Sequence, residues 1–106
     1  LLLSQNNCGP TVHINIVSFR PYGYDCQKKT YWTLFEEIME KYKGRPHWGK
    51  LHKCSTKHLK ELYGENINKF IELKKSVDPE NLFYNKYYKR HFEENDNLLQ
   101  EITYSP

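Results

Sequence analysis

The 106-residue sequence contains no alanine, a single methionine and no apolar run near the ~18 residues that a membrane-spanning helix needs. No charged region precedes Leu1–Leu3 in this sequence, and we expect that these residues are not a signal peptide. The chain also lacks an initiator Met, and we expect a fragment of a longer protein that begins at the broken end of an apolar segment. Aromatic residues make up 15%, which argues against intrinsic disorder and favours one small folded domain.

Cysteine is scarce, and its three positions are far apart. An odd number of unpaired Cys gives no disulfide framework, so we expect reduced or buried thiols. Metal-ligating side chains occur close together in one stretch, but their spacing matches none of the usual paired zinc patterns, and we predict no metal site. The three cysteines are Cys8, Cys26 and Cys54. The clustered metal-ligating side chains are those of His47, His52, Cys54 and His58.

Recognised catalytic patterns are absent as well: there is no glycine-rich phosphate loop, nucleophilic triad or paired-carboxylate site. The net charge is only +3, but residues 41–60 hold seven Lys or Arg and no acid. Such a run favours an anionic partner. One reading of the chain is therefore a small basic binding module for nucleic acid or another anion, although no recognised nucleic-acid motif is present. The cations of the run are Lys41, Lys43, Arg45, Lys50, Lys53, Lys57 and Lys60.

Hydropathy patterns predict one strand and several helices. Residues 11–20 are rich in β-branched side chains and predict a strand that ends at Pro21. Apolar residues at helical spacing predict a helix over 31–42 with a buried stripe, ended by a glycine at position 44. Two further helices are expected at 56–63 and 66–77. The buried stripe is Tyr31, Leu34, Phe35, Ile38, Met39 and Tyr42.

The segment Arg45–His52 is predicted to be a loop, because Pro46 and Gly49 exclude a regular element. It carries a guanidinium, two imidazoles, an indole and an ammonium within eight residues. Those groups suit an anionic or electron-rich ligand, and loops held between two helices are common seats of function.

Short motifs occur in one order along the chain: Arg20-Pro21-Tyr22-Gly23, Tyr31-Trp32, Gly44-Arg45-Pro46-His47-Trp48-Gly49-Lys50 with His52, and Asp78-Pro79 with Phe83, Asn85 and Tyr87. In order and spacing they resemble the C-terminal part of the aldonolactone oxidases, the L-gulonolactone and D-arabinono-1,4-lactone oxidase family of vanillyl-alcohol-oxidase type. The resemblance runs from about residue 1 to 92. The G-R-P-H-W-x-K signature is its most specific part, with Gly49 where the animal enzymes often carry Ala.

The resemblance implies an α+β fold. Residues 1–92 would be the C-terminal part of a substrate (cap) domain with a flavin-contacting arm, and residues 93–106 a tail. One or two antiparallel strands, a long one at about residues 11–20 and a second, short one at Leu1–Ser4, would be followed by three or more helices. The remaining strands, the N-terminal FAD domain and a substrate-binding Glu-x-Arg pair of such enzymes have no counterpart in this sequence.

The implied activity is FAD-dependent oxidation of a sugar-acid 1,4-lactone to the 2-keto-lactone, which gives ascorbate or an analogue and hydrogen peroxide. The fragment alone would be inactive. Lys50 and His47 are the implied catalytic residues; Lys50 would stabilise charge that develops during hydride transfer, and His47 would hydrogen-bond the flavin or the substrate hydroxyl. The implied flavin contacts are His47, Trp48 and Lys50, and the implied substrate contacts are His13, Asn15 and Lys50.

The implied partners are the lactone, O2 and the N-terminal FAD domain of the same protein, and not nucleic acid. The resemblance also implies microsomal (endoplasmic reticulum) membrane localisation for an animal-type member and mitochondrial localisation for a fungal or plant type. It leaves open which lactone is preferred, and whether O2 or cytochrome c takes the electrons.

Overall fold

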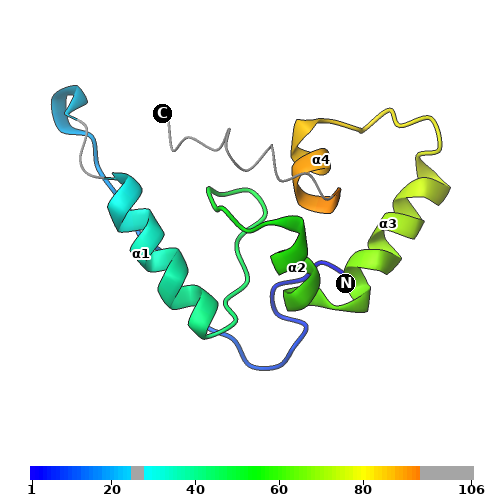
Figure 1. The fold of residues 1–106 in the computed structure, drawn as a ribbon, viewed down its shortest axis with the longest axis horizontal. Helices are drawn as coiled ribbons and strands as arrows, with labels where there is room; N and C mark the ends of the chain where they lie inside the picture. The colour runs from blue at the N-terminus through cyan, green and yellow to red at the C-terminus, as the bar shows by residue number, and fades with distance from the viewer. Residues whose placement is uncertain (25–27, 94–106) are drawn as a thin grey trace.

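The computed structural model describes residues 1–24 and 28–93. In this part the chain forms a one-turn 3-10 helix at Pro21–Gly23 and four α-helices. Figure 1 shows α2, α3 and α4 gathered on one side of the molecule, while α1 stands apart on the other side of the loop that joins it to α2. The helices are α1 (Lys28–Lys41), α2 (Thr56–Tyr63), α3 (Glu65–Val77) and α4 (Lys86–Phe92).

The α+β prediction is wrong, because residues 1–24 and 28–93 contain helices but no strand. Residues 11–20 have no regular secondary structure, and Val12 and Ile14 are 83% and 56% exposed. A strand is stabilised by ladder hydrogen bonds to a second strand. No second strand in the described part of the chain supplies those hydrogen bonds. Residues 11–20 therefore stay irregular, although their β-branched side chains favour a strand. Leu1–Ser4 forms a turn instead, in which the Ser4 amide donates to the Leu1 carbonyl over 3.3 Å.

The predicted helices are confirmed where local signals define them. The helix predicted at 56–63 is α2, the one at 66–77 is α3, and the one at 31–42 is α1. Ser55 caps α2, because its Oγ accepts from the backbone N–H of His58 over 3.1 Å. Gly64 separates α2 from α3 with φ 57° and ψ −139°, a backbone conformation that is strained for any residue with a Cβ.

Gly44 ends the α1 region as predicted, but for a different reason. The left-handed conformation falls on Lys43, with φ 54°, and the Gly44 amide donates to the Met39 carbonyl over 2.7 Å. A Cβ at position 44 would lie 2.6 Å from Met39 Cε and 3.1 Å from Met39 O. Glycine is therefore needed here because the backbone turns back closely onto α1.

The hydrophobic core lies between α2, α3 and α4, where α2 packs against both of the other helices. Arg45 ties the loop to this core: its guanidinium lies 4.2 Å from the centre of the Tyr63 ring and donates to the carbonyl of Leu62 over 2.9 Å. The same guanidinium donates to the carbonyl of Ser4. The buried hydrophobic residues are Leu59, Tyr63, Ile67 and Phe92.

The predicted buried stripe of α1 is wrong for most of its members. Tyr31, Leu34 and Ile38 are 50–54% exposed, and only Phe35 and Met39 are half-buried. The periodic pattern identifies the helix, but the described chain offers no layer to cover this face. The side chains of α1 that do find neighbours are those that face the segment 14–17 and the loop after α1.

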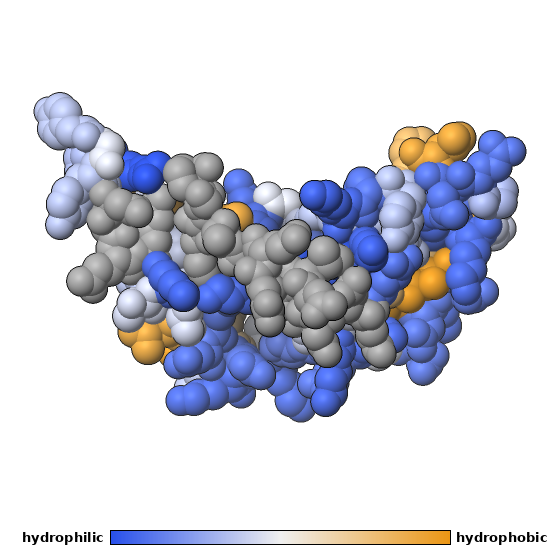
Figure 2. Space-filling view, turned by 45° about the horizontal axis from the view of Figure 1, so that its top comes forward, coloured by the Kyte–Doolittle hydropathy of each residue, from blue (hydrophilic) through white to orange (hydrophobic). Residues whose placement is uncertain are grey.

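Apolar side chains also remain on the surface at the opposite end of the molecule. Val77 at the end of α3, and Leu82 and Phe83 in the connection between α3 and α4, are 70–79% exposed. In Figure 2 hydrophilic residues cover most of the visible face, and apolar residues show at both ends. Within residues 1–24 and 28–93, no helix has the length and apolar character to cross a membrane.

Candidate functional site

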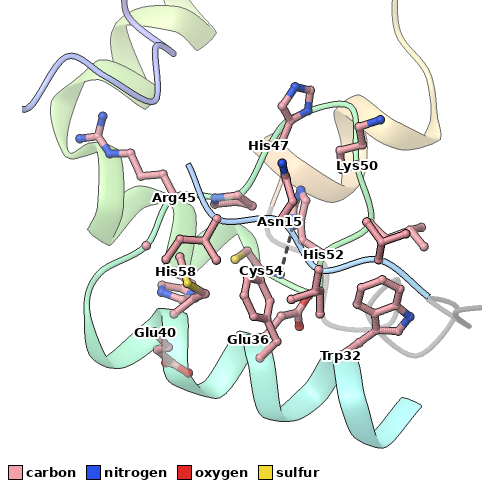
Figure 3. Close-up of a pocket in the computed structure, with 18 residues that line it drawn as sticks. Asn15, Trp32, Glu36, Glu40, Arg45, His47, Lys50, His52, Cys54 and His58 are labelled. Carbon is pink, nitrogen blue, oxygen red and sulfur yellow. Dashed lines mark hydrogen bonds between the residues drawn. The ribbon is translucent and has the colours of Figure 1, made fainter. Parts of the chain in front are cut away.

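A pocket of about 480 Å³ lies between α1, the segment 14–17 and the loop that joins α1 to α2 (Figure 3). Its walls are mainly apolar, and charged and polar groups from α1 and the loop face one another across it. Such a lining, apolar with a few polar groups, is typical of a small-molecule site. The lining residues are Ile14, Asn15, Ile16, Val17, Trp32, Phe35, Glu36, Met39, Glu40, Gly44, Arg45, Pro46, His47, Lys50, Leu51, His52, Cys54 and His58.

Three of the five residues that the sequence singled out line this pocket: Asn15, His47 and Lys50. Figure 3 shows them on the side of the pocket away from α1, with Glu36 and Glu40 rising from α1 opposite them. Asn15 comes from the exposed segment 14–17, and the other two come from the loop. The fold therefore brings together groups that are 35 positions apart in the sequence.

A hydrogen-bonded turn fixes His47 beside Lys50. The Lys50 amide donates to the His47 carbonyl over 3.1 Å, and the Gly49 amide donates to His47 Nδ1 over 3.0 Å. Because Nδ1 accepts a hydrogen bond, the proton of the neutral ring lies on Nε2, which is thereby a donor. Lys50 is exposed, and its ammonium has no ion-pair partner in residues 1–24 and 28–93.

The loop is held against α1 at its far end. The Lys53 amide donates to Glu36 Oε1 over 2.9 Å, and Lys53 Nζ lies 3.2 Å from Thr33 Oγ1. Sequence reasoning did not single out Glu36. Glu36 lies on the face of α1 that is turned toward the basic loop, and this position is what identifies it as part of the site.

Trp48 is half-buried and packs against the core, outside the pocket lining. Its ring stacks on Phe92 at 5.7 Å and 17°, and its Nε1 donates to the carbonyl of Leu3 over 2.9 Å. His13 is exposed and does not line the pocket. The flavin contact of Trp48 and the substrate contact of His13 stay predictions.

Cys54 lines the pocket with a thiol that resists ionisation. Burial, followed by the negative charge of Glu36, raises the pKa of Cys54 to about 11. A thiol in this state is a weak nucleophile. In the described part of the chain, no three His, Cys, Asp or Glu side chains are placed to hold a metal ion together.

His52, at the end of the loop, is 4% exposed and is hydrogen-bonded to His91 of α4. Burial, followed by the positive charges of Arg90 and His91, lowers the pKa of His52 to about 3. The sequence did not predict the contact between His52 and His91, because nothing in the local sequence marks a residue 39 positions away as a partner.

The sequence pattern of the family described as D-arabinono-1,4-lactone oxidase matches residues 1–91, and the chain belongs to this family. The resemblance that the motifs indicated is thereby confirmed. Among individual proteins, the chain is 37% identical over 92 residues to L-gulonolactone oxidase of Mus musculus. That alignment covers 87% of this chain and 21% of the mouse protein.

Two other relatives differ in the activity that their names give. The chain is 31% identical over 87 residues to a putative D-arabinono-1,4-lactone oxidase of Neurospora crassa, with 78% of this chain and 16% of the relative covered. It is 39% identical over 62 residues to an L-gulono-1,4-lactone dehydrogenase of Mycobacterium tuberculosis, with 58% and 14% covered. The chain thus spans about a fifth or less of the length of these relatives. No solved structure matches the chain.

Proposed function

We propose that this chain is the part of an FAD-dependent aldonolactone oxidase that supplies the cationic His47–Lys50 turn to the reacting lactone. The single observation that carries the proposal is this turn, held at the rim of a pocket in a chain that belongs to the family. The reaction is oxidation of the carbinol next to the lactone carbonyl to a ketone, which gives the 2-keto-lactone. L-gulono- or D-arabinono-1,4-lactone is the substrate type, because the names of the relatives give both.

The donor set of the turn fits one end of FAD. An ammonium and an imidazole N–H suit the electron-rich edge of the isoalloxazine ring, which becomes more negative on reduction. The described residues offer no glycine-rich phosphate cradle for the rest of the cofactor, so Lys50 and His47 would hold the ring end only. The chemistry supplied by bound FAD is acceptance of a hydride, with later reoxidation by O2 to give hydrogen peroxide.

Lys50 acts in this proposal as a positive charge at the rim of the pocket. Oxidation of the carbinol removes a hydride from its carbon, which the bound acceptor takes up, and releases the hydroxyl proton to solvent at the exposed rim of the pocket. Because the proton leaves ahead of the hydride, negative charge is present on the oxygen during the step. A compact ammonium at the rim stabilises that charge, and a pocket with mainly apolar walls strengthens the interaction. His47 donates from Nε2 and orients the same oxygen, because Nδ1 is already occupied by the Gly49 amide.

Asn15 is a pocket residue whose side chain suits lactone recognition. A side-chain amide donates and accepts, as recognition of a polyhydroxylated lactone requires. His13, two positions earlier on the same segment, is proposed as a further lactone contact, although it lies outside the pocket lining. Trp48 lies between His47 and Gly49 in the sequence. Its contacts with Phe92 and Leu3 hold this part of the loop against the core and so support the site.

The exposed apolar faces support a larger assembly around this chain. Tyr31, Leu34 and Ile38 of α1 and Val12 and Phe19 beside it are 50–83% exposed. Folded monomers rarely leave apolar residues gathered in this way. We propose that the FAD domain and the rest of the substrate domain of the same enzyme cover them. Microsomal or mitochondrial membrane localisation is inherited from the family type in this proposal.

The basic run offers less to an anionic macromolecule than its composition suggests. Arg45 donates to two backbone carbonyls and lies over Tyr63, and Lys53 is hydrogen-bonded to Thr33. Two of the cations thus serve the fold, which favours the oxidase over a binding module.

The proposal is tested by transplantation. Residues 1–92 of this chain replace the 92 aligned residues of the mouse L-gulonolactone oxidase, and lactone-dependent peroxide release is measured. The chain alone should release none, and the chimera should release peroxide above a version that lacks the segment. A folded, FAD-loaded chimera without lactone oxidation would overturn the proposal.

A further inference from the structure

Two histidines that the proposed reaction does not use are buried against each other beneath the loop. His91 is fully buried in the last turn of α4, and His52 is 4% exposed where the loop approaches α2. Their Nε2 atoms are 3.0 Å apart, and their rings meet edge to face with centres 4.9 Å apart at 72°. The pair therefore joins α4 directly to the loop that carries His47 and Lys50. In Figure 3 His52 lies below both residues.

The surrounding groups assign the protons of the pair. His91 Nδ1 is 2.7 Å from the carbonyl oxygen of Tyr87, which can only accept, so Nδ1 carries the hydrogen. Nε2 of a neutral His91 is then an acceptor, and His52 donates to it from its own Nε2. The bare Nδ1 of His52 accepts from the Cys54 amide over 3.3 Å. Each ring nitrogen has a partner only when both rings are neutral.

We infer that the His52–His91 pair positions the His47–Lys50 turn against α4, and that acid releases the turn by protonating the pair. The pair is a positioning device in this inference, because His91 lies outside the pocket lining, and His52, which lines the pocket, uses both ring nitrogens in hydrogen bonds to His91 and to the Cys54 amide. The effect of the pair on catalysis rests on the proposed function, whereas the hydrogen bond between the two rings does not.

Protonation of either ring places a donor against a donor. A proton on His91 Nε2 faces the N–H of His52, and a proton on His52 Nδ1 faces the Cys54 amide. Arg90 adds positive charge at the same place, because its Nη2 donates to the His52 carbonyl and lies 3.5 Å from His52 Nδ1. Charge repulsion and lost hydrogen bonds therefore act together.

The other titratable groups around the pair do not offset this repulsion. The ring of Tyr87 of α4 stacks on that of His91 with centres 3.8 Å apart, and the ring of Trp48, which does not titrate, lies 5.8 Å from it. From α1, Glu36 accepts from the backbone of Lys53, next to His52. From the loop itself, Cys54 contributes a neutral thiol.

The pH range follows from linkage. Burial, then Arg90 and His91, lowers the pKa of His52 to about 3, and burial is also the largest cause that lowers the pKa of His91. In the unfolded chain both pKa values are near 6.5. The folded state thus binds fewer protons, so stability is full above about pH 6.5 and falls as the pH drops toward 3. His52 can change the opening constant about tenfold per pH unit in this range, and His91 acts in the same direction.

The first measurement is the protonation state of each imidazole, by two-bond proton–nitrogen NMR on the 106-residue chain labelled with nitrogen-15. At pH 7 we expect hydrogen on Nδ1 of His91 and on Nε2 of His52, both rings neutral. The opposite tautomer of either ring, or an imidazolium at pH 7, would overturn the inference. This readout needs no variant.

The second measurement is amide hydrogen exchange at Lys50 and Cys54 between pH 7 and pH 5, corrected for the intrinsic pH dependence and referred to amides of α3. We expect protection at both amides to fall about tenfold or more, and α3 amides to lose less. His52→Gln with His91→Gln keeps one donor and one acceptor but cannot titrate, so its protection should change less than threefold.

His13→Gln is the matched control, because it removes an exposed histidine and should keep the pH response of the original chain. An equal loss of protection in the double Gln variant would show that the pair is not the sensor. None of these readouts uses lactone, so failure of the proposed oxidase activity would leave them unchanged.

Discussion

The indole Nε1 of Trp48 donates a hydrogen bond to the carbonyl of Leu3, 2.9 Å away and 45 positions earlier in the sequence. The same ring stacks on Phe92 and lies 5.4 Å from the ring of Tyr63. Tyr87 also donates from its hydroxyl to the backbone carbonyl of Trp48. Trp48 is thus the anchor of the loop, and its neighbours His47 and Gly49 stay on the surface because it is fixed below them.

Substitution of Trp48 should separate its packing from its hydrogen bond. Trp48→Phe keeps an aromatic ring but loses the bond to Leu3, and should lower the free energy of unfolding by about 1 kcal/mol. Trp48→Ala also removes the ring from the core, and should cost about 3 kcal/mol. Urea unfolding followed by far-ultraviolet circular dichroism measures both. Equal costs for the two variants would contradict the anchoring role.

A matched pair of leucines tests where the core lies. Leu59 of α2 is 0% exposed and Leu34 of α1 is 54% exposed. Leu59→Ala should therefore cost about 2–5 kcal/mol, whereas Leu34→Ala should cost well under half of that. Urea midpoints of the two variants, measured on the 106-residue chain, give the comparison. A Leu34→Ala cost equal to that of Leu59→Ala would mean that α1 is buried in solution.

Cys54 should resist alkylation. With its pKa raised to about 11 by burial and by Glu36, only about one thiol in a thousand is ionised at pH 8. An iodoacetamide pulse followed by peptide mass spectrometry should label the exposed Cys8 far faster. Glu36→Gln removes one cause of the raised pKa and should speed labelling of Cys54. Comparable labelling of Cys8 and Cys54 in the folded chain would show that the thiolate is accessible.

Local signals in the sequence explain why α1, α2 and α3 were predictable, whereas α4 was not predicted. Ser55 and Gly64 lie at the two ends of α2, so its bounds follow from capping and from a backbone conformation that favours glycine. The strand at 11–20 failed for the opposite reason, since a strand depends on a partner that a linear pattern does not contain. Leu34 and Ile38 show the same limit, because periodicity identifies a helix face and not what covers it.

The candidate site was predictable in part for related reasons. His47 and Lys50 lie within one short motif, and a hydrogen-bonded turn is all that is needed to bring them together. Asn15 reaches the same pocket only through the tertiary fold. The pairing of His91 with His52 was not predicted, because the two rings meet only when α4 packs under the loop.

The central claim is that Lys50 stabilises charge during lactone oxidation, and the chimera with the mouse L-gulonolactone oxidase tests it most directly. Lys50→Met keeps the length of the side chain and removes its charge. Lys57→Met is the matched control, because Lys57 belongs to the same basic run but is exposed on α2 outside the pocket. The measurement is the rate of lactone oxidation at saturating lactone in both variants.

The expected result is a loss of about 10²–10³ in this rate for Lys50→Met, with lactone affinity changed much less. Lys57→Met should keep the rate of the unsubstituted chimera. Lys50→Arg should recover little, since a planar guanidinium does not replace a compact ammonium. A Lys50→Met rate within about threefold of the unsubstituted chimera would contradict the claim and leave the loop with a structural role only.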